Sequence, residues 1–164
     1  MGTPFLIYRT DATMNQTRSE DPLRSYPVVI DLPVQWGDMD AFGHINNTVY
    51  FRYFESARIA YLRAIGFEGG GGEKGEERGP ILASTHCRFR KPLVFPDTVR
   101  VGARTTEVGE DRFVMEYRIV SEKLGGVVAD GGGTVVSFDY REKRKARLPD
   151  AVRGRIEAIG VGSG

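Results

Sequence analysis

Within the stretch from Tyr26 to Trp36, valine, isoleucine, leucine or tryptophan stands at every second position from Val28 onward. A period of two places these side chains on one face of an extended chain, as in a β-strand with one buried side. Pro33 falls within the alternation, and proline cannot donate a hydrogen bond to a neighbouring strand. We therefore predict a strand over residues 26–36 that lies at a sheet edge or carries a bulge.

A different periodicity follows between Thr48 and Ile65, a stretch without glycine or proline. Apolar residues recur there at intervals of three or four, which is the spacing of one helical face. This face consists of Tyr50, Phe54, Ala57, Tyr61 and Ile65. Further apolar residues cover most of the remaining circumference, which predicts a long, buried, central helix. Asn46 or Asn47 can cap its start, and Gly66 ends it.

Four further stretches carry the alternation that is typical of strands. They are Ile81–Lys91, Thr98–Val108, Arg112–Lys123 and Val127–Tyr140. Glycine, proline and aspartate separate them, which favours sequential antiparallel hairpins. Gly131-Gly132-Gly133 inside the last stretch predicts a bulge or a close approach to the backbone. The whole pattern predicts an α+β domain in which a five-stranded antiparallel sheet wraps the long helix.

Three segments lack such a pattern and set the expected domain boundaries. Residues 1–25 show no periodicity, and we expect a mobile N-terminal tail. Residues 69–79 are all glycine or charged, which predicts a flexible insert that is dispensable for folding. The domain should span residues 26–150 and be followed by a C-terminal tail, residues 151–164, with a short helix over Pro149–Ile159.

Composition and charge argue against several classes of protein. The 164 residues suffice for one domain, and 23 basic against 22 acidic side chains give a net charge of +1. A nucleic-acid binder needs a basic excess to neutralise phosphates. The single cysteine allows no internal disulfide, and with two histidines it leaves little for a soft-metal site. No apolar run reaches the length of a signal-peptide core or a membrane span, so we expect a soluble cytoplasmic protein without a membrane partner.

The densest group of polar side chains lies between the first strand and the helix. It consists of Asp38, Asp40, His44, Asn46 and Asn47, with Gly37 and Gly43 at the bends. N–H groups at a helix start can stabilise a carbonyl oxygen under attack, and a nearby carboxylate can activate water or attack an acyl carbon. The alternative is structural, with the aspartates capping the turn and His44 packed with its nitrogens satisfied.

Other chemical groups have a structural explanation that we favour. Glu55, two turns into the helix, can act as an acid or base, but we expect it to pair with Arg52 or Arg58 at helical spacing. Cys87 falls on the apolar face of its strand and is expected to be an inert, buried thiol.

Two further patterns are weaker. Residues 70–75 match the dinucleotide-binding pattern of glycines, but they follow a helix instead of a strand, so we reject this interpretation. The basic residues at positions 88–91 and 141–155 are expected to be solvated. The alternative is that they contact the phosphates of a nucleotide-bearing ligand.

The stretch from Val34 to Arg58, VQWGDMDAFGHINNTVYFRYFESAR, resembles the hotdog-fold acyl-CoA thioesterases of the 4-hydroxybenzoyl-CoA thioesterase-like group. The resemblance continues more loosely through Phe89–Leu93, Asp97 and Leu148–Pro149. In that family a long helix is wrapped by an antiparallel sheet, two subunits join their sheets edge to edge, and the sites form at the subunit interface. The resemblance therefore implies a hotdog fold and a homodimer or homotetramer.

The resemblance also implies roles for individual residues. The family's catalytic carboxylate is the second aspartate of a Gly-Asp-x-Asp pattern, here Asp40, and N–H groups at the helix start polarise the thioester carbonyl. His44 is then a catalytic helper, and the residues around the substrate are Gly43, Asn46, Asn47, Tyr50 and Glu55. This implies hydrolysis of an acyl-CoA to the free acid and CoA without a metal or redox cofactor.

The sequence Gly43-His44-Ile45-Asn46-Asn47 departs from the hydroxybenzoyl members, so an aromatic acyl group does not follow. Asp40 can attack as a nucleophile or direct water. Two other functions compete: a hotdog hydratase or dehydratase, which releases no thiol, and a non-catalytic acyl-CoA-binding protein, which shows no turnover.

Overall fold

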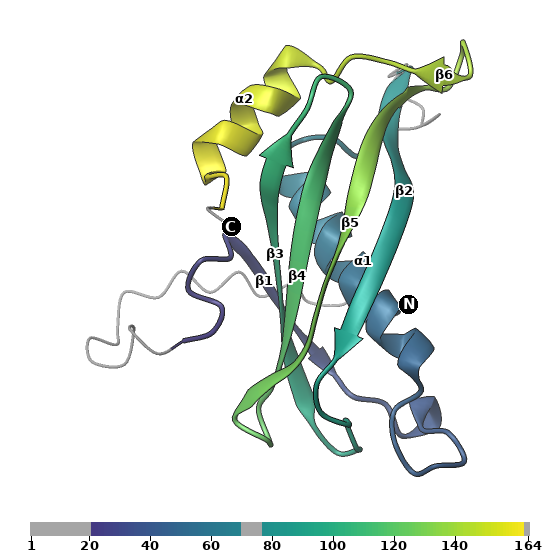
Figure 1. The fold of residues 1–164 in the computed structure, drawn as a ribbon, viewed down its shortest axis with the longest axis vertical. Helices are drawn as coiled ribbons and strands as arrows, with labels where there is room; N and C mark the ends of the chain where they lie inside the picture. The colour runs from purple at the N-terminus through teal and green to yellow at the C-terminus, as the bar shows by residue number, and fades with distance from the viewer. Residues whose placement is uncertain (1–20, 70–76, 163–164) are drawn as a thin grey trace, which may run out of the picture.

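The computed structural model describes residues 21–69 and 77–162, and Figure 1 shows a long helix behind an antiparallel sheet. A shorter helix lies near one end of the sheet. The elements in chain order are β1 (Val28–Pro33), the short 3-10 helix η1 (Trp36–Asp38), α1 (Asn47–Ala64), β2 (Arg78–Phe89), β3 (Thr98–Val108), β4 (Arg112–Ser121), β5 (Gly126–Asp139), β6 (Arg144–Lys145) and α2 (Asp150–Ile159). The predicted α+β architecture is confirmed.

The strand order is β1-β3-β4-β5-β2, with every neighbouring pair antiparallel. The two-residue strand β6 adds to β5. β3, β4 and β5 form the expected hairpins, but β2 pairs with β5, so the expected hairpin of β2 with β3 is wrong. Residues 90–97 therefore run past the ends of β5 and β4, and no described strand pairs with the other edge of β2. Alternation along the chain predicts a strand but contains no information about its partner.

α1 packs one side of its surface against the sheet. The predicted apolar face is confirmed, since Phe54, Ala57 and Tyr61 are fully buried. The prediction of a buried, central helix holds for only part of the circumference of α1 in the single chain, because Glu55 is exposed and Ile59 keeps 42% of its accessible surface. In the single chain the sheet lies on one side of α1 (Figure 1), and exposed residues of the helix include Arg52, Glu55 and Arg63.

The glycine run in β5 allows α1 to approach the sheet closely. A Cβ at Gly131 would lie 2.7 Å from Cζ of Phe54 and would overlap the carbonyl oxygen of His86. The Phe54 ring also stacks on Tyr117, with ring centroids 4.9 Å apart. The register shifts of the sheet lie outside Gly131–Gly133. Of the two structures predicted for this glycine run, the close backbone approach is therefore confirmed and the bulge is not.

The segment Asp21–Pro27, called the outer strap below, packs on the face of the sheet opposite α1. Leu23 and Tyr26 are 2% and 7% exposed and pack with Val120. The guanidinium carbons of Arg104 and Arg118 lie 5.0 and 5.7 Å from the centroid of the Tyr26 ring, which is cation–π geometry. The outer strap is therefore attached to the sheet by both apolar and charged contacts.

Gly102 on β3 leaves room for this packing, since a Cβ there would lie 2.7 Å from Cγ of Tyr26. Arg100 adds an ion pair, with its Nη2 3.1 Å from Oδ2 of Asp21. Residues 21–25 are thus part of the folded domain and not of the predicted tail, because contacts with a distant strand hold them in place. The rest of that predicted tail, residues 1–20, lies outside the described residues.

α2 confirms the predicted C-terminal helix. Val152 and Ile156 are buried and belong to the main core, so residues 151–159 are packed and the predicted tail there is wrong. Of the predicted glycine-rich insert, residues 70–76 lie outside the described residues, and Arg78 and Gly79 already belong to β2.

Asp21→Asn is expected to lower the free energy of unfolding slightly near neutral pH, and to have little effect at acidic pH. Burial raises the pKa of Asp21, but hydrogen bonds from Arg100 and from the Leu23 N–H outweigh burial and bring the pKa below its ordinary value. A lowered carboxyl pKa stabilises the fold above the unfolded-state pKa of about 4, and this stabilisation is lost as the pH falls below it. The side chain is 33% exposed, so we expect a loss of less than about 1 kcal/mol.

Urea unfolding near neutral pH and at about pH 3 measures this difference. Glu122→Gln, an exposed carboxylate on the turn after β4, is the control and should leave both values unchanged. An equal loss at both pH values for Asp21→Asn would contradict the assigned ion pair.

Candidate active site

Asp40 lies in a tight turn between η1 and α1. Its N–H donates to the His44 carbonyl at 2.8 Å, and the Gly43 N–H donates to the Asp40 carbonyl at 3.0 Å. Gly43 has a φ of +77°, a left-handed conformation that favours glycine. Oδ1 of Asp40 accepts the Phe42 N–H at 2.9 Å. The turn places Asp40 and His44 opposite each other, and the second carboxylate oxygen has no hydrogen-bond donor among the described residues.

The turn leads directly into the N-terminus of α1. Asn46 is the cap, as one of the two predicted alternatives: its Oδ1 accepts the Thr48 N–H at 2.9 Å. The Asn46 carbonyl accepts the Val49 N–H at 3.0 Å. The Asn47 N–H has no acceptor within residues 21–69 and 77–162. Because the helix N-terminus carries a partial positive charge, this N–H is available to a carbonyl oxygen that gains negative charge.

Asp38, the other aspartate of the predicted cluster, has a basic partner. Nη2 of Arg52 lies 2.6 Å from Oδ1 of Asp38, and the two side chains are 64% and 18% exposed. The Asp38 carbonyl accepts the Asn46 N–H at 2.9 Å. Asp40 has no such ion pair in the described part of the chain, so the two aspartates differ in their surroundings.

The connection between β2 and β3 forms the next wall of this region. The Ile45 N–H donates to the Leu93 carbonyl at 2.9 Å. The Tyr50 hydroxyl accepts the Leu93 N–H at 3.2 Å and donates to the Lys91 carbonyl at 3.4 Å. Burial raises the pKa of Tyr50, and the residue is 3% exposed. The structure therefore places Tyr50 in the core, where it joins α1 to this connection.

Glu55 is exposed on α1, about 12 Å along the helix axis from Asn47 at 1.5 Å per residue. The expected ion pair with Arg52 or Arg58 is wrong for the described residues. Arg52 pairs with Asp38, and Arg58 donates to the Tyr117 hydroxyl at 3.5 Å. Helical spacing made both arginines available, but partners from other elements bind them.

Cys87 is half-buried against the core, and burial raises the pKa of its thiol to about 11. It stays protonated at neutral pH, in agreement with an inert thiol. No three His, Cys, Asp or Glu residues of the described chain lie together in a group that could hold a metal ion. Of the helices that the structure describes, none is long and apolar enough to cross a membrane.

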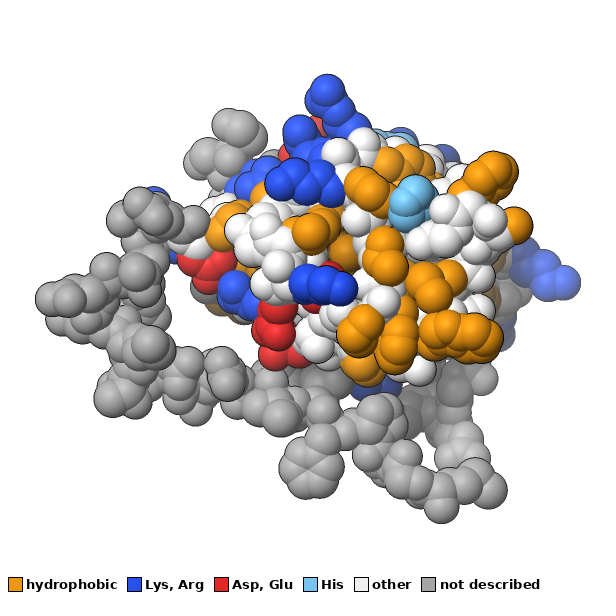
Figure 2. All heavy atoms as spheres, turned by 90° about the horizontal axis from the view of Figure 1, so that it is seen from below, with side chains coloured by type: hydrophobic (Ala, Val, Ile, Leu, Met, Phe, Trp, Pro, Cys, Tyr) orange, Lys and Arg blue, Asp and Glu red, His pale blue; other side chains and the backbone are white. Residues whose placement is uncertain are grey.

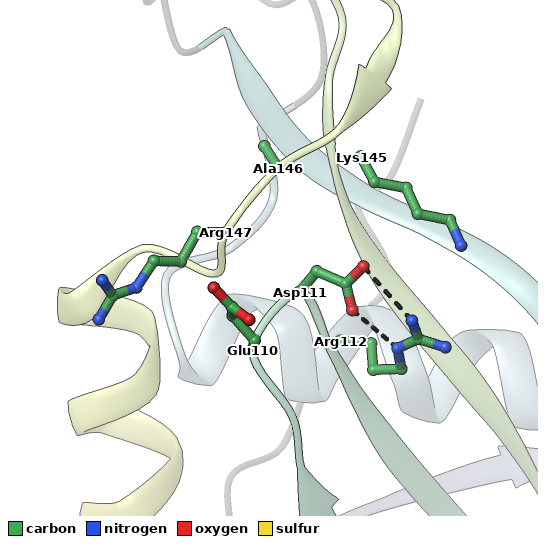
Figure 3. Close-up of a pocket in the computed structure, with 6 residues that line it drawn as sticks. All are labelled: Glu110, Asp111, Arg112, Lys145, Ala146 and Arg147. Carbon is green, nitrogen blue, oxygen red and sulfur yellow. Dashed lines mark hydrogen bonds and ion pairs between the residues drawn. The ribbon is translucent and has the colours of Figure 1, made fainter.

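A shallow cleft of about 460 Å³ lies at the far end of the sheet from η1. It is lined by Glu110, Asp111, Arg112, Lys145, Ala146 and Arg147. Figure 3 shows Asp111 and Arg112 pointing toward each other, joined by hydrogen bonds. Arg147 pairs with Asp150 at 3.4 Å. The cleft is therefore a charged surface hollow and does not include the turn of Asp40.

The end of the molecule that carries η1 has an apolar surface. Figure 2 views this end and shows hydrophobic side chains gathered over part of it. Large exposed apolar residues in the segments of this end include Trp36, Phe42, Val94, Phe95 and, on the turn between β4 and β5, Leu124; Phe42 is 85% exposed. Gathered apolar surface of this kind marks a ligand or protein contact.

Two contacts in this region could not be predicted from the spacing of residues along the chain. Arg52 appeared as a candidate partner of Glu55, although it binds Asp38 on the preceding loop. Leu93 is 43 residues from Tyr50 in the sequence, so its contact depends on the sheet order. The only signal for Leu93 was its place in the looser part of the family resemblance.

The sequence model of the Thioesterase-like superfamily matches residues 34–156. The chain belongs to this superfamily. The match covers the turn of Asp40, α1, the whole sheet except β1, and much of α2. The predictions of a hotdog fold and of a thioester hydrolase are thereby confirmed.

Individual relatives agree with this assignment. A thioesterase from Thermus thermophilus, solved in complex with coenzyme A and Zn, is 31% identical, covers 82% of this chain and 95% of its own, and has a TM-score of 0.70. The 1,4-dihydroxy-2-naphthoyl-CoA hydrolase of Synechococcus is 27% identical over 136 residues, 79% of this chain and 88% of the relative. The long-chain acyl-CoA thioesterase FadM of Escherichia coli is 22% identical over 122 residues, 74% of this chain and 90% of the relative.

Proposed function

We propose that this member of the superfamily hydrolyses an acyl-CoA thioester to the free carboxylic acid and CoA. The observation that carries the proposal is the position of the Asp40 carboxylate, in a turn that leads directly into the N-terminus of α1. Asp40 activates water or attacks the acyl carbon itself. In either case a bond from the acyl carbon to oxygen forms, its bond to sulfur breaks, and the CoA sulfur takes up a proton. If the carboxylate itself attacks, the product of this step is a mixed anhydride with Asp40, which water then hydrolyses to the free acid. General-base assistance of this kind typically contributes about 10²–10⁴-fold.

The thioester carbonyl is proposed to bind at the start of α1. The N–H of Asn47 is the donor, because Asn46 already accepts the N–H groups of Thr48 and Val49. One well-placed donor to a developing oxyanion contributes about 10²–10³-fold. Asn46 takes part through its cap, which orients this first turn.

The remaining predicted site residues receive more limited roles. His44, exposed at the end of the turn, assists Asp40 in proton transfer, and Gly43 provides the bend between them. Tyr50 acts indirectly, since backbone groups of residues 91 and 93 occupy its hydroxyl. Glu55 contacts substrate outside the catalytic turn, because it lies about two turns from the helix start on the exposed side of α1.

The CoA part of the substrate is supported by the Thermus relative, which was solved with coenzyme A. The acyl groups of the relatives differ, since these proteins are named for an aromatic and for a long-chain acyl-CoA substrate. We therefore propose acyl-CoA as the substrate class without naming one acyl chain.

Thiol release from a panel of short-chain, long-chain and aryl acyl-CoAs tests this function. We expect release of free thiol, detected with a thiol-reactive dye, from at least one class. Hydration of an enoyl-CoA without thiol release would support the hydratase alternative. Saturable binding with no turnover on the whole panel would support a binding protein.

We further propose that two copies of the chain pair through β2. The outer edge of this strand has no partner among the described strands, and exposed edges are ordinarily paired or protected. Leu82 and Phe89 on β2 are 38% and 46% exposed. Pairing of two β2 strands would cover them and produce a homodimer, from which a homotetramer can be built.

Leu82→Lys is expected to weaken this dimer at least about tenfold in Kd, because lysine on an edge strand opposes edge-to-edge pairing. Light scattering at micromolar concentration measures the mass of each variant. Val161→Lys, just after α2 and not on β2, is a control of similar exposure at 43% and should remain a dimer. A wild-type protein that is monomeric under these conditions would rule out the proposed pairing.

A further inference from the structure

The bonds within the turn of Asp40 determine its shape but not its place beside α1. The hydrogen bonds between Asp40 and His44, between Gly43 and Asp40, and between Phe42 and the Asp40 carboxylate all lie within residues 40–44. Such a turn could move as a unit relative to the Asn47 N–H. Contacts to other segments must therefore hold the carboxylate at the correct distance from the helix start.

Asp38 provides three such contacts from a single residue. Its N–H donates to the Gln35 carbonyl at 3.2 Å, and its carbonyl accepts the Asn46 N–H at 2.9 Å. Its carboxylate accepts from Arg52 at 2.6 Å, in the second turn of α1. Asp38 thus connects the start of the loop, the residue that caps α1 and the body of the helix.

The surroundings of Asp38 make its charge important. Its side chain is only 18% exposed, and the nearby Tyr53 hydroxyl is buried without a hydrogen-bond partner among the described residues. Burial, followed by the negative charge of Asp38, raises the pKa of Tyr53 to about 12. A carboxylate in partly desolvated surroundings depends on its ion partner more than an exposed one does.

We propose that Asp38 and Arg52 form a positioning pair that holds the Asp40 turn against the N-terminus of α1. The pair touches neither substrate nor the reacting atoms in this proposal, which rests on the proposed function of Asp40. The two aspartates of the Asp38-Met39-Asp40 segment therefore have different tasks. Asp38 sets the geometry and Asp40 does the chemistry.

Arg52→Ala is expected to lower kcat roughly tenfold, since a misplacement of about 1 Å in a catalytic group can reduce the rate up to about 10²-fold. KM should change little, and the melting temperature should fall only slightly, because Arg52 is 64% exposed and water can reach the Asp38 carboxylate that it leaves unpaired. Arg52→Lys keeps a cation at this position and should recover most of the lost kcat. Thiol-release kinetics and a thermal melt of each variant provide these values.

A double-mutant cycle tests whether Asp38 and Arg52 affect kcat through their shared contact or through separate effects of the two substitutions. Asp38→Asn alone should match Arg52→Ala, and the double variant should be no slower than either single variant, because both remove the same contact. Arg63→Ala is the matched control, since it breaks the exposed Arg63–Glu68 pair of 2.7 Å on the same helix. This control should keep the wild-type kcat.

The outcomes distinguish this inference from the proposed function. If Asp40→Asn keeps full activity, the assignment of the catalytic carboxylate is wrong. If Asp40→Asn is inactive while Arg52→Ala keeps the wild-type kcat, the positioning pair is wrong and the proposed function stands. Independent, additive losses for Asp38→Asn and Arg52→Ala would likewise overturn the pair.

Discussion

Replacing Asp40 with asparagine is expected to lower kcat for thiol release at least about 10²-fold, the lower range for the loss of a catalytic base or nucleophile. In the wild type the Phe42 N–H donates to Oδ1 of Asp40 at 2.9 Å. Asparagine keeps an Oδ1 that can accept the same N–H, so the turn should retain its shape. The variant loses the negative charge that deprotonates water or attacks the acyl carbon. Thiol-release kinetics with the best substrate of the panel measure the loss.

Two comparisons make this result specific. Urea unfolding should give the same free energy for Asp40→Asn and the wild type, which shows that the fold is intact. Asp31→Asn removes an exposed carboxylate on β1, away from the turn, and should keep full activity. Near-wild-type thiol release by a well-folded Asp40→Asn protein would exclude Asp40 as the catalytic group.

Gly131→Ala is expected to cause the largest loss of stability from a single methyl group. The new Cβ would lie 2.7 Å from Cζ of Phe54 and would overlap the His86 carbonyl oxygen. Phe54 is fully buried and stacked on Tyr117, so its ring has no free space into which to move. The carbonyl belongs to β2, which pairs with β5 at this position. Overpacking of this kind costs about 1–3 kcal/mol, and we expect the upper part of that range.

Thermal melting and urea unfolding measure this loss, which corresponds to a fall in Tm of about 5–10 °C for a domain of this size. Gly154→Ala is the matched control. Gly154 lies in α2, and nothing lies within 4 Å of the position that a Cβ would take there. Alanine should therefore leave the stability unchanged or raise it by up to about 1 kcal/mol. Equal melting temperatures for the two variants would contradict the close contact between Phe54 and β5.

Elements whose signals lie between neighbouring residues could be predicted without knowledge of the fold. The spacing of apolar residues located α1 and its buried face, and the Asn46 cap was one of two alternatives at its start. Alternation located all five long strands, although their ends shifted by a few residues. The position of Asp40 before the helix also followed from adjacent residues. Local periodicity and capping depend on the chain within one or two turns, so they can be seen without a fold.

Contacts between distant segments could be assigned only from the folded chain. Because β2 pairs with β5, the other edge of β2 has no partner among the described strands. Contacts with Arg104 and Arg118 hold the outer strap on the sheet, although part of it was predicted to be a mobile tail. The choice of Asp38 as the partner of Arg52 also depended on the path of the loop before α1. Glu55 is three residues from Arg52 in the sequence and Asp38 is fourteen residues away, yet the folded chain brings the more distant carboxylate to the guanidinium. That proximity is a property of the packed chain, because it is set by the strand order and the close approach of α1 to the sheet.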